Sequence, residues 1–343
     1  MDLGTVERDN RRGAGQMAAR QHRVTSVDVA REAGVSRATV SYVLNKVPNQ
    51  KISEETRLKV LAAVERLGYT PSSAARDLRR GRNDIVLLLL KDMPLGFTAL
   101  ELVEQLTDSL GRHELTLVTR LERKRPLAEL WRELTPAAVV FFTNVAEDDR
   151  AQLSTAGTHI VHHWSDAADR NSINSGQTDV GRLQADHLAR AGHRTLGYLL
   201  PDDPRFHDFY DLRLEGVRQG CAAHGLKAPD VRTMPFGSTA AVNIARAWKA
   251  AGVTGVCAFN DEFAFSLLAG MRTAGLTAPD DLAVVGVDDI PLAQFAVPPL
   301  TTVRQDMRIV ADNLTHQVLK GLGLAVGGGT RTSSITLVVR DSA

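Results

Sequence analysis

Residues 24–45 read VTSVDVAREAGVSRATVSYVLN, which predicts two short helices joined by a tight turn. Ser26 is expected to cap the first helix, because its hydroxyl can accept a hydrogen bond from an otherwise unpaired backbone N–H. Gly34 suits the turn, where a residue without Cβ costs least, and Ser36 is expected to cap the second helix. The expected apolar faces are Val27, Ala30 and Ala33 in the first helix and Val40, Val43 and Leu44 in the second. Such a pair is either an ordinary helical hairpin or a helix-turn-helix, whose second helix enters the DNA major groove.

The residues that follow favour the helix-turn-helix. Ser53 is placed to cap a third helix, with Glu54 and Glu55 in the first turn, where the helix dipole favours negative charge. The sequence Gly68-Tyr69-Thr70-Pro71 ends that helix, and residues 72–81 form a short, basic, amphipathic segment. The expected apolar face of the third helix is Leu58, Leu61, Val64 and Leu67.

Residues 24–80 as a whole closely resemble the DNA-binding headpiece and hinge helix of the lactose repressor (lacI) family. The matching elements stand in the family's order: Asp28-Val29-Ala30, Gly34-Val35-Ser36, Thr39-Val40-Ser41, Val43-Leu44-Asn45, Gly68-Tyr69 and residues 75–78. The resemblance implies a transcription regulator, most often a repressor, that binds a pseudo-palindromic operator DNA as a homodimer.

The resemblance also implies which residues contact DNA. Arg37, Ala38 and Tyr42 would face base edges, and Arg37 can donate two hydrogen bonds to guanine; the alternative for Arg37 is a phosphate contact. Tyr42 departs from the arginine that is commonest at its position in the family. Leu78 would wedge into the minor groove, or else pack against the neighbouring hinge helix. The other expected DNA-binding residues are Thr25, Ser36, Thr39, Ser41 and Asn45 in the headpiece and Ser72 and Ala75 in the hinge.

Charge and composition agree with a DNA-binding head on a soluble body. Residues 1–82 hold 16 Lys and Arg against nine Asp and Glu, whereas the other residues hold 25 against 31. Only the head is therefore expected to meet phosphate. The longest aliphatic run, residues 85–90, is too short to span a membrane, and no apolar signal core begins the chain. We expect a cytoplasmic protein without a membrane partner, with Cys221 and Cys257 as reduced packing residues.

From residue 83 onwards, β-rich runs alternate with helical stretches, which predicts an α/β fold of doubly wound parallel sheets. The expected strands are residues 85–90, 115–118, 137–142, 159–161, 195–200, 255–259 and 282–287, and the expected helices include residues 99–110, 180–191, 212–224 and 262–274.

The resemblance implies a periplasmic-binding-protein-like core whose two lobes close on a small ligand. The expected domains are a disordered tail (1–22), the helix-turn-helix headpiece (23–70), the hinge helix (71–82), an N-terminal lobe (83–175 and 302–328) and a C-terminal lobe (176–301 and 329–343).

Effector-binding residues are expected in the crevice at the carboxyl ends of the strands. Arg213, Asn260 and Asp288 match the family's positions; the alternative for Asp288 and its neighbour Asp289 is a helix cap or turn. A guanidinium, an amide and a carboxylate suit a sugar or nucleoside effector, since each makes paired hydrogen bonds. Residues 91–97 and Gly176-Gln177 depart from the family's sugar-contacting regions.

Other functions are less well supported. The chain has no phosphate-binding loop and no nucleophile elbow, so we expect neither a cofactor nor catalytic residues. His159, His162 and His163 near Asp166 are interpreted as a strand end rather than a zinc site. The alternatives that stay open are a sugar- or nucleoside-binding module without regulatory output, a sugar hydrolase, and an architectural DNA binder that ignores ligands.

Overall fold

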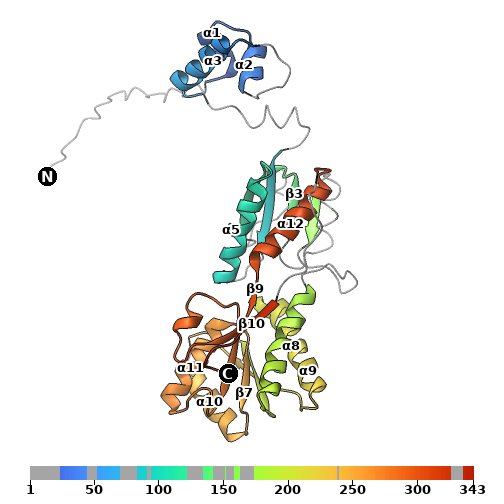
Figure 1. Cartoon of the computed structure of the whole chain (residues 1–343), viewed down its shortest axis with the longest axis vertical. Helices are drawn as coiled ribbons and strands as arrows, with labels where there is room; N and C mark the ends of the chain where they lie inside the picture. The colour runs from blue at the N-terminus through green and yellow to red at the C-terminus, as the bar shows by residue number, and fades with distance from the viewer. Residues whose placement is uncertain are drawn as a thin grey trace, which may run out of the picture. The chain divides into compact units, whose positions relative to one another are not determined.

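The computed structural model describes residues 24–44, 52–69, 83–90, 94–121, 134–141, 151, 158–162, 174–237, 239–325 and 335–343. The chain divides into two compact units, residues 1–81 and residues 82–343 (Figure 1). The expected N-terminal tail, Asn45 and the hinge residues Ser72, Ala75 and Leu78 lie outside the described residues.

The first unit contains three helices, α1 (Ser26–Ala33), α2 (Arg37–Leu44) and α3 (Glu54–Leu67), which confirms the helix-turn-helix and its third helix. Gly34 ends α1 with a φ of 65°, a backbone conformation that favours glycine. The core between the three helices consists of Val29, Ala30, Val40, Val43, Val60 and Ala63.

Three details of the headpiece differ from the sequence prediction. Thr25, not Ser26, is the N-cap of α1, and its backbone N–H and hydroxyl both donate to the Asp28 carboxylate, at 2.9 and 2.6 Å. Leu58 and Leu61 are exposed, because each residue turns a helix by about 100° and both leucines fall outside the buried stripe of α3. Val27 of α1 is also exposed.

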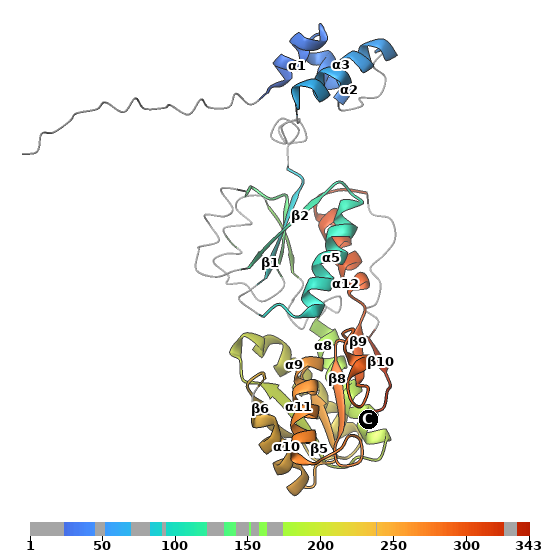
Figure 2. The same cartoon turned by 90° about the vertical axis from the view of Figure 1, so that its left-hand side faces the viewer.

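The second unit begins with a four-stranded sheet in the order β2-β1-β3-β4, all parallel. The strands are β1 (Ile85–Leu90), β2 (Thr116–Leu121), β3 (Ala138–Phe141) and β4 (His159–His162). β1 reads IVLLLL and is buried nearly throughout, as expected for a parallel strand covered on both faces. Helix α5 (Phe97–Gly111) lies beside α12 (Met307–Gly321), which also packs on β3 and β4 (Figure 2).

A six-stranded sheet follows, in the order β10-β9-β8-β7-β5-β6. Its strands are β5 (Leu196–Pro201), β6 (Asp230–Met234), β7 (Gly255–Ala258), β8 (Ala283–Val287), β9 (Thr301–Gln305) and β10 (Ile335–Val338), and only β10 runs antiparallel to its neighbour.

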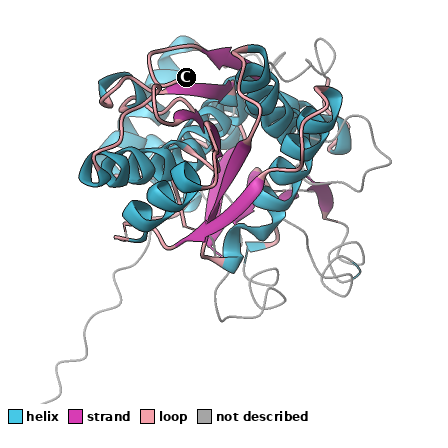
Figure 3. Ribbon diagram, turned by 90° about the horizontal axis from the view of Figure 1, so that it is seen from below, coloured by secondary structure: helices cyan, strands magenta, loops and turns pink. Residues whose placement is uncertain are grey.

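Helices cover both faces of this sheet (Figure 3). Helices α8 (Asn174–Arg190) and α9 (His207–Ala223) pack together on one face, while α10 (Ala240–Ala250) and α11 (Asp261–Ala274) pack together on the other. Two short 3-10 helices, η1 (Pro204–Phe206) and η2 (Ala293–Phe295), lie in the connections. These layers confirm the doubly wound α/β fold, and Cys221 and Cys257 are both free and buried.

The chain crosses from the six-stranded sheet to the four-stranded sheet between β9 and α12. The sequence analysis placed this return at residue 302, but residues 301–305 still pair within the six-stranded sheet, with β8 on one side and β10 on the other. The return therefore begins at α12.

Among the described residues, no helix has the length and apolar character needed to cross a membrane.

Candidate functional site

The recognition helix α2 presents several of the expected DNA-contacting residues to solvent. Arg37, Ala38 and Tyr42 are exposed, and so are Thr25 and Ser36 at the starts of α1 and α2. Thr39 and Ser41 are half-buried. Ser36 caps α2 as expected, because its hydroxyl accepts from the Thr39 backbone N–H at 3.1 Å.

Ser26 has a role that the sequence analysis missed. Its hydroxyl accepts a hydrogen bond from the Nε of Arg37 at 3.1 Å, across the turn between α1 and α2. The guanidinium is thereby held at one nitrogen, and its two terminal nitrogens carry the N–H groups that a bidentate guanine contact requires.

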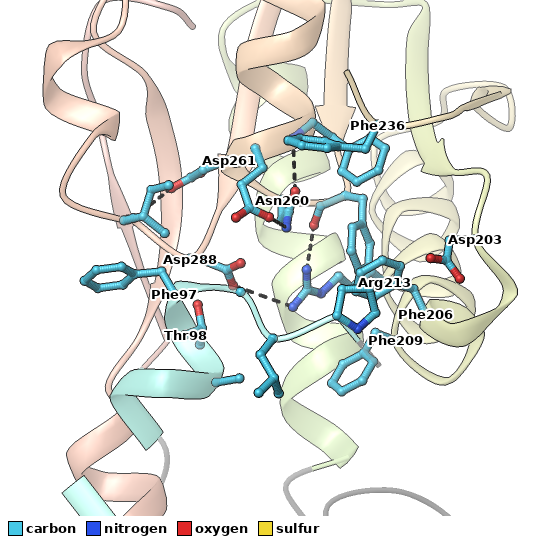
Figure 4. A pocket seen from close by; sticks show the side chains of 18 of the residues that line it. Phe97, Thr98, Asp203, Phe206, Phe209, Arg213, Phe236, Asn260, Asp261 and Asp288 are labelled. Carbon is cyan, nitrogen blue, oxygen red and sulfur yellow. Dashed lines mark hydrogen bonds and ion pairs between the residues drawn. The ribbon is translucent and has the colours of Figure 1, made fainter. Parts of the chain in front are cut away.

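The second unit contains a cavity of ≈ 430 Å³, a size typical of small-molecule sites (Figure 4). The start of α5 and the start of α12 line it from one half of the unit. The other half contributes the carboxyl ends of β5, β7 and β8, as expected for a parallel sheet. Arg213, Asn260 and Asp288, the three expected effector-binding residues, all line this cavity.

Arg213 of α9 is almost fully buried and is held by three groups. Its Nε donates to Gln177 Oε1 at 2.8 Å, and its Nη1 donates to the Phe259 carbonyl at 2.5 Å. Gln177 Nε2 in turn donates to Gln305 Oε1 at 3.1 Å. The third group is Asp288, whose Oδ1 lies 3.8 Å from the Nη2 of Arg213 (Figure 4). Gln177, which appeared only as a departure from the family's sequence, is therefore the residue that orients Arg213.

Close packing of α8 on α9 places Gln177 and Arg213 side by side. A Cβ added at Gly181 of α8 would lie 1.8 Å from the Arg213 carbonyl oxygen, and one at Gly216 of α9 would lie 1.9 Å from the Thr178 carbonyl oxygen. Only glycine allows the two backbones to approach this closely. The two glycines thus set the distance between the helices that carry the hydrogen-bonded pair.

Asp288 and Asp289 follow β8 in the left-handed region, with φ values of 106° and 48°, and their carboxylates have different roles. Asp289 is buried and paired with two arginines, since Arg304 Nε donates to it at 2.7 Å and Arg340 Nη2 at 2.6 Å. Asp288 faces the cavity beside Thr98 (Figure 4). Burial raises the pKa of Asp288 to about 6, although the nearby Arg213 charge lowers it.

Asn260 serves as a helix cap as well as lining the cavity. Its Oδ1 accepts from the Phe263 backbone N–H at 3.1 Å, and its Nδ2 donates to Glu262 Oε2 at 3.0 Å. Both atoms of the amide therefore already have partners, which makes Asn260 a weaker candidate for ligand contact than Arg213 or Asp288.

Asp261 is a buried carboxyl group that the sequence analysis did not single out. Its Oδ2 accepts from the Ile290 backbone N–H at 2.9 Å and its Oδ1 accepts from the Thr302 hydroxyl at 2.6 Å. Burial raises its pKa to about 8, and the neighbouring Asp288 charge adds to the rise. Asp261 therefore ties the loop after β8 to strand β9 immediately behind the cavity.

Six of the ten phenylalanines of the chain line the cavity, which the sequence analysis also missed because they are scattered along the chain. The centroid of the Phe259 ring lies 5.2 Å from that of the Phe206 ring and 6.0 Å from that of the Phe263 ring. The six are Phe97, Phe206, Phe209, Phe236, Phe259 and Phe263.

The expected strand-end histidine is in place, because His159 begins β4. Burial lowers the pKa of His159, which favours its neutral form. His163 and Asp166 lie outside the described residues, and within the described part of the chain no three His, Cys, Asp or Glu side chains are grouped as metal ligands.

Known proteins resemble both units. Residues 25–72 match the family described as bacterial regulatory proteins, lacI family, and residues 185–343 match the periplasmic binding protein-like domain. The HTH-type transcriptional repressor PurR of Photobacterium profundum is 30% identical over 299 residues, which cover 83% of this chain and 87% of that relative. The chain belongs to the lacI family of bacterial regulatory proteins.

Other relatives agree with this assignment. The HTH-type transcriptional regulator GalR of Escherichia coli is 29% identical over 309 residues, covering 86% of this chain and 88% of GalR. The lac repressor dimer bound to operator and the anti-inducer ONPF has the same fold, with a TM-score of 0.77 at 23% identity over 94% of this chain and 99% of that one. The transcriptional regulator CelR in complex with cellobiose gives a TM-score of 0.64 at 25% identity over 94% of this chain and 100% of that one.

These relatives are transcription regulators and not enzymes. The lacI-family protein described here is accordingly a DNA-binding transcription regulator. This assignment excludes two of the alternative functions, the sugar hydrolase and the binding module without regulatory output.

Proposed function

We propose that this lacI-family regulator is a homodimeric repressor that binds a pseudo-palindromic operator and responds to a small effector in the cavity of its second unit. The observation that carries the proposal is the joint presence of a helix-turn-helix with an exposed arginine at its recognition helix and a ligand-sized cavity holding Arg213 and Asp288. A cavity of this size argues against an architectural DNA binder that ignores ligands.

Operator binding would use the exposed face of α2. Arg37 contacts a base edge, Ala38 offers a methyl group to thymine, and Tyr42 takes the place of the family's usual arginine. Thr25, Ser36, Thr39 and Ser41 would contact phosphate or cap helices. Asn45 and the hinge residues Ser72, Ala75 and Leu78 stay predictions from the sequence.

Dimerisation would supply two headpieces to a symmetric site. Support comes from an apolar surface after β8, where Leu292, Phe295 and Val297 are 62%, 72% and 65% exposed. Three large apolar side chains this exposed within six consecutive residues are typical of a surface that a partner covers.

Effector response would arise because the two halves of the unit both line the cavity. A ligand shifts the DNA-binding equilibrium only through its different affinity for two arrangements of the protein. Arg213 and Asp288 would hold the ligand, with Asn260 in support. The resemblance implies an effector of the sugar or nucleoside class, and the lining of the cavity bears further on that class.

The test begins with the full-length protein and a pool of random DNA fragments, whose bound fraction is sequenced. We expect a two-fold symmetric motif, with half-sites spaced as one dimer requires, and two chains per bound fragment by light scattering. Recovery of an asymmetric half-site bound by one chain would contradict the dimer, and recovery of no motif would contradict sequence-specific binding.

A further inference from the structure

The polar groups of the cavity are mostly bonded to one another. Gln177 and Gln305 bond to each other, and Gln177 also accepts from Arg213. Asn260 is occupied as a helix cap and by Glu262, and Asp261 by Ile290 and Thr302. A neutral sugar needs a hydrogen-bond partner for almost every hydroxyl, since each unpaired buried group is costly. The described lining offers such partners mainly at Asp202, Asp288, Glu262 and the Nη2 of Arg213.

The charged lining residues have an excess of carboxylates. Asp202, Asp203, Glu262 and Asp288 stand against Arg205 and Arg213 among the described lining residues, whereas Asp261, whose pKa burial raises to about 8, is largely neutral near pH 7. Arg205 is committed to Asp203, to which it donates hydrogen bonds at 2.6–3.1 Å. Glu262 and the Arg213–Asp288 pair line the cavity, where low polarity strengthens the attraction for a positive charge.

The remaining walls are phenyl rings, whose faces attract cations. The cavity already contains one such contact, because the Arg213 guanidinium carbon lies 4.8 Å from the centroid of the Phe259 ring. Phe97 and Phe236 are 47% and 66% exposed and line the cavity from opposite halves of the unit. Figure 4 shows Phe97 at the start of α5 on the side of Asp288, and Phe236 on the side of Asn260.

From these three features we infer that the cavity selects an organic cation with an aromatic or apolar body, whose protonated nitrogen lies at Asp288 and Glu262 and whose body lies among the phenylalanine rings. The inference rests on the proposed function, since it names the class of effector that the same cavity takes. Carboxylates supply the charge and hydrogen-bond acceptors for an ammonium group, and the rings supply apolar area and cation–π contact.

The test uses isothermal titration calorimetry on the full-length protein with three probes of one shape: 2-phenylethylamine, 2-phenylethanol and phenylacetate. Glucose and adenosine represent the neutral sugar and nucleoside classes. We expect the amine to bind at least about tenfold more tightly than the alcohol, and the carboxylate not to bind. Operator affinity, followed by fluorescence anisotropy, should change with the amine alone.

Two variants locate the binding site. Glu262→Gln keeps the acceptor for Asn260 but removes the charge, and Phe236→Ala removes an exposed ring; each should weaken amine binding about tenfold. Glu215→Gln on the outer face of α9 is the matched control, because Glu215 is 51% exposed and does not line the cavity.

The outcomes separate the inference from the proposed function. If glucose or adenosine binds more tightly than the amine and alters operator binding, the cationic class is wrong while effector control stands. If the amine binds selectively and operator affinity does not move, the ligand class stands and effector control is wrong. Equal affinity for amine and alcohol, or no binding of any probe, overturns the inference.

Discussion

Replacing Gly216 with alanine tests the idea that two helix backbones in contact position the arginine of the cavity. The new Cβ would lie 1.9 Å from the Thr178 carbonyl oxygen, whereas ordinary contact begins at 3.4 Å. Helix α9 must therefore retreat from α8 by about 1.5 Å. Arg213 lies on α9 and Gln177 on α8, so a shift of this size would lengthen their 2.8 Å hydrogen bond beyond bonding distance.

We expect Gly216→Ala to lower the free energy of unfolding by about 3 kcal/mol, the upper end for overpacking, because the clash is with backbone and no side chain can move aside. Urea unfolding followed by the fluorescence of the buried Trp248 and by far-UV circular dichroism measures the loss.

Gly111→Ala is the matched control. Gly111 also lies in a helix, but nothing lies within 4 Å of a Cβ added there, so alanine should be neutral or stabilise by up to about 0.5–1 kcal/mol. If Gly216→Ala were as stable as Gly111→Ala, close backbone contact between α8 and α9 would not be what positions Arg213.

Three further changes test the base contact of the headpiece, the buried carboxyl group of Asp261, and the pairing of Asp289 with Arg304 and Arg340, here called the arginine clasp. Arg37→Ala should weaken specific operator binding by about 1–3 kcal/mol and relax preference at one base pair of each half-site, measured by anisotropy on operator variants. Asp261→Asn should flatten the pH dependence of the free energy of unfolding. In the folded wild type the pKa of this carboxyl group is about 8, whereas in the unfolded chain it is near 4. The wild type is therefore most stable below pH 4 and loses stability as the pH rises towards 8. Asp289→Asn should lower the free energy of unfolding in urea by about 2–3 kcal/mol, because Arg340 loses its buried partner. This figure counts little for the pair with Arg304, whose side chain is exposed.

Each of these changes has a control on the surface. Arg57→Ala on α3 should not alter base preference, and a uniform loss over all operator variants for Arg37→Ala, with a shallower salt dependence, would assign Arg37 to phosphate. Asp280→Asn changes an exposed carboxylate and should move neither the pH dependence nor the stability. Parallel pH profiles for the wild type and Asp261→Asn would refute the buried proton, and an unchanged unfolding midpoint for Asp289→Asn would refute the clasp.

The headpiece and the alternation of the core could be read from the sequence because they depend on local patterns. Glycine after a helix, serine before one and short buried runs such as residues 85–90 each predict one element by themselves. Strands β6 and β9 and helix α10 were among the elements missed. Strand β6 alternates half-buried and exposed residues at the sheet edge, and α10 consists largely of small residues. Leu58 was misplaced because a helix rich in apolar residues has more than one plausible face.

The site was only partly predictable, since its function depends on contacts between distant residues. Arg213 and Asp288 were found through the family's pattern, but Gln177 acquires its role from a helix 36 residues away in the chain. The six phenylalanines share no spacing that would group them before the chain folds. Asp261 looks like an ordinary first-turn acid, and only burial behind Thr302 distinguishes it.

The cavity has two kinds of lining residue, which has a consequence for engineered biosensors. Its floor consists of buried side chains that hydrogen-bond to one another, Arg213, Gln177 and Gln305, and its rim consists of the exposed rings of Phe97 and Phe236. Arg213, Gln177 and Gln305 hold one another, so changing any of them disturbs the cavity's shape as well as its chemistry. Phe97 and Phe236 are 47% and 66% exposed, so libraries at these two positions would sample new ligands at a smaller cost in folding than changes at the buried residues. Natural divergence faces the same asymmetry, so new specificities in this lineage should arise first at the rim.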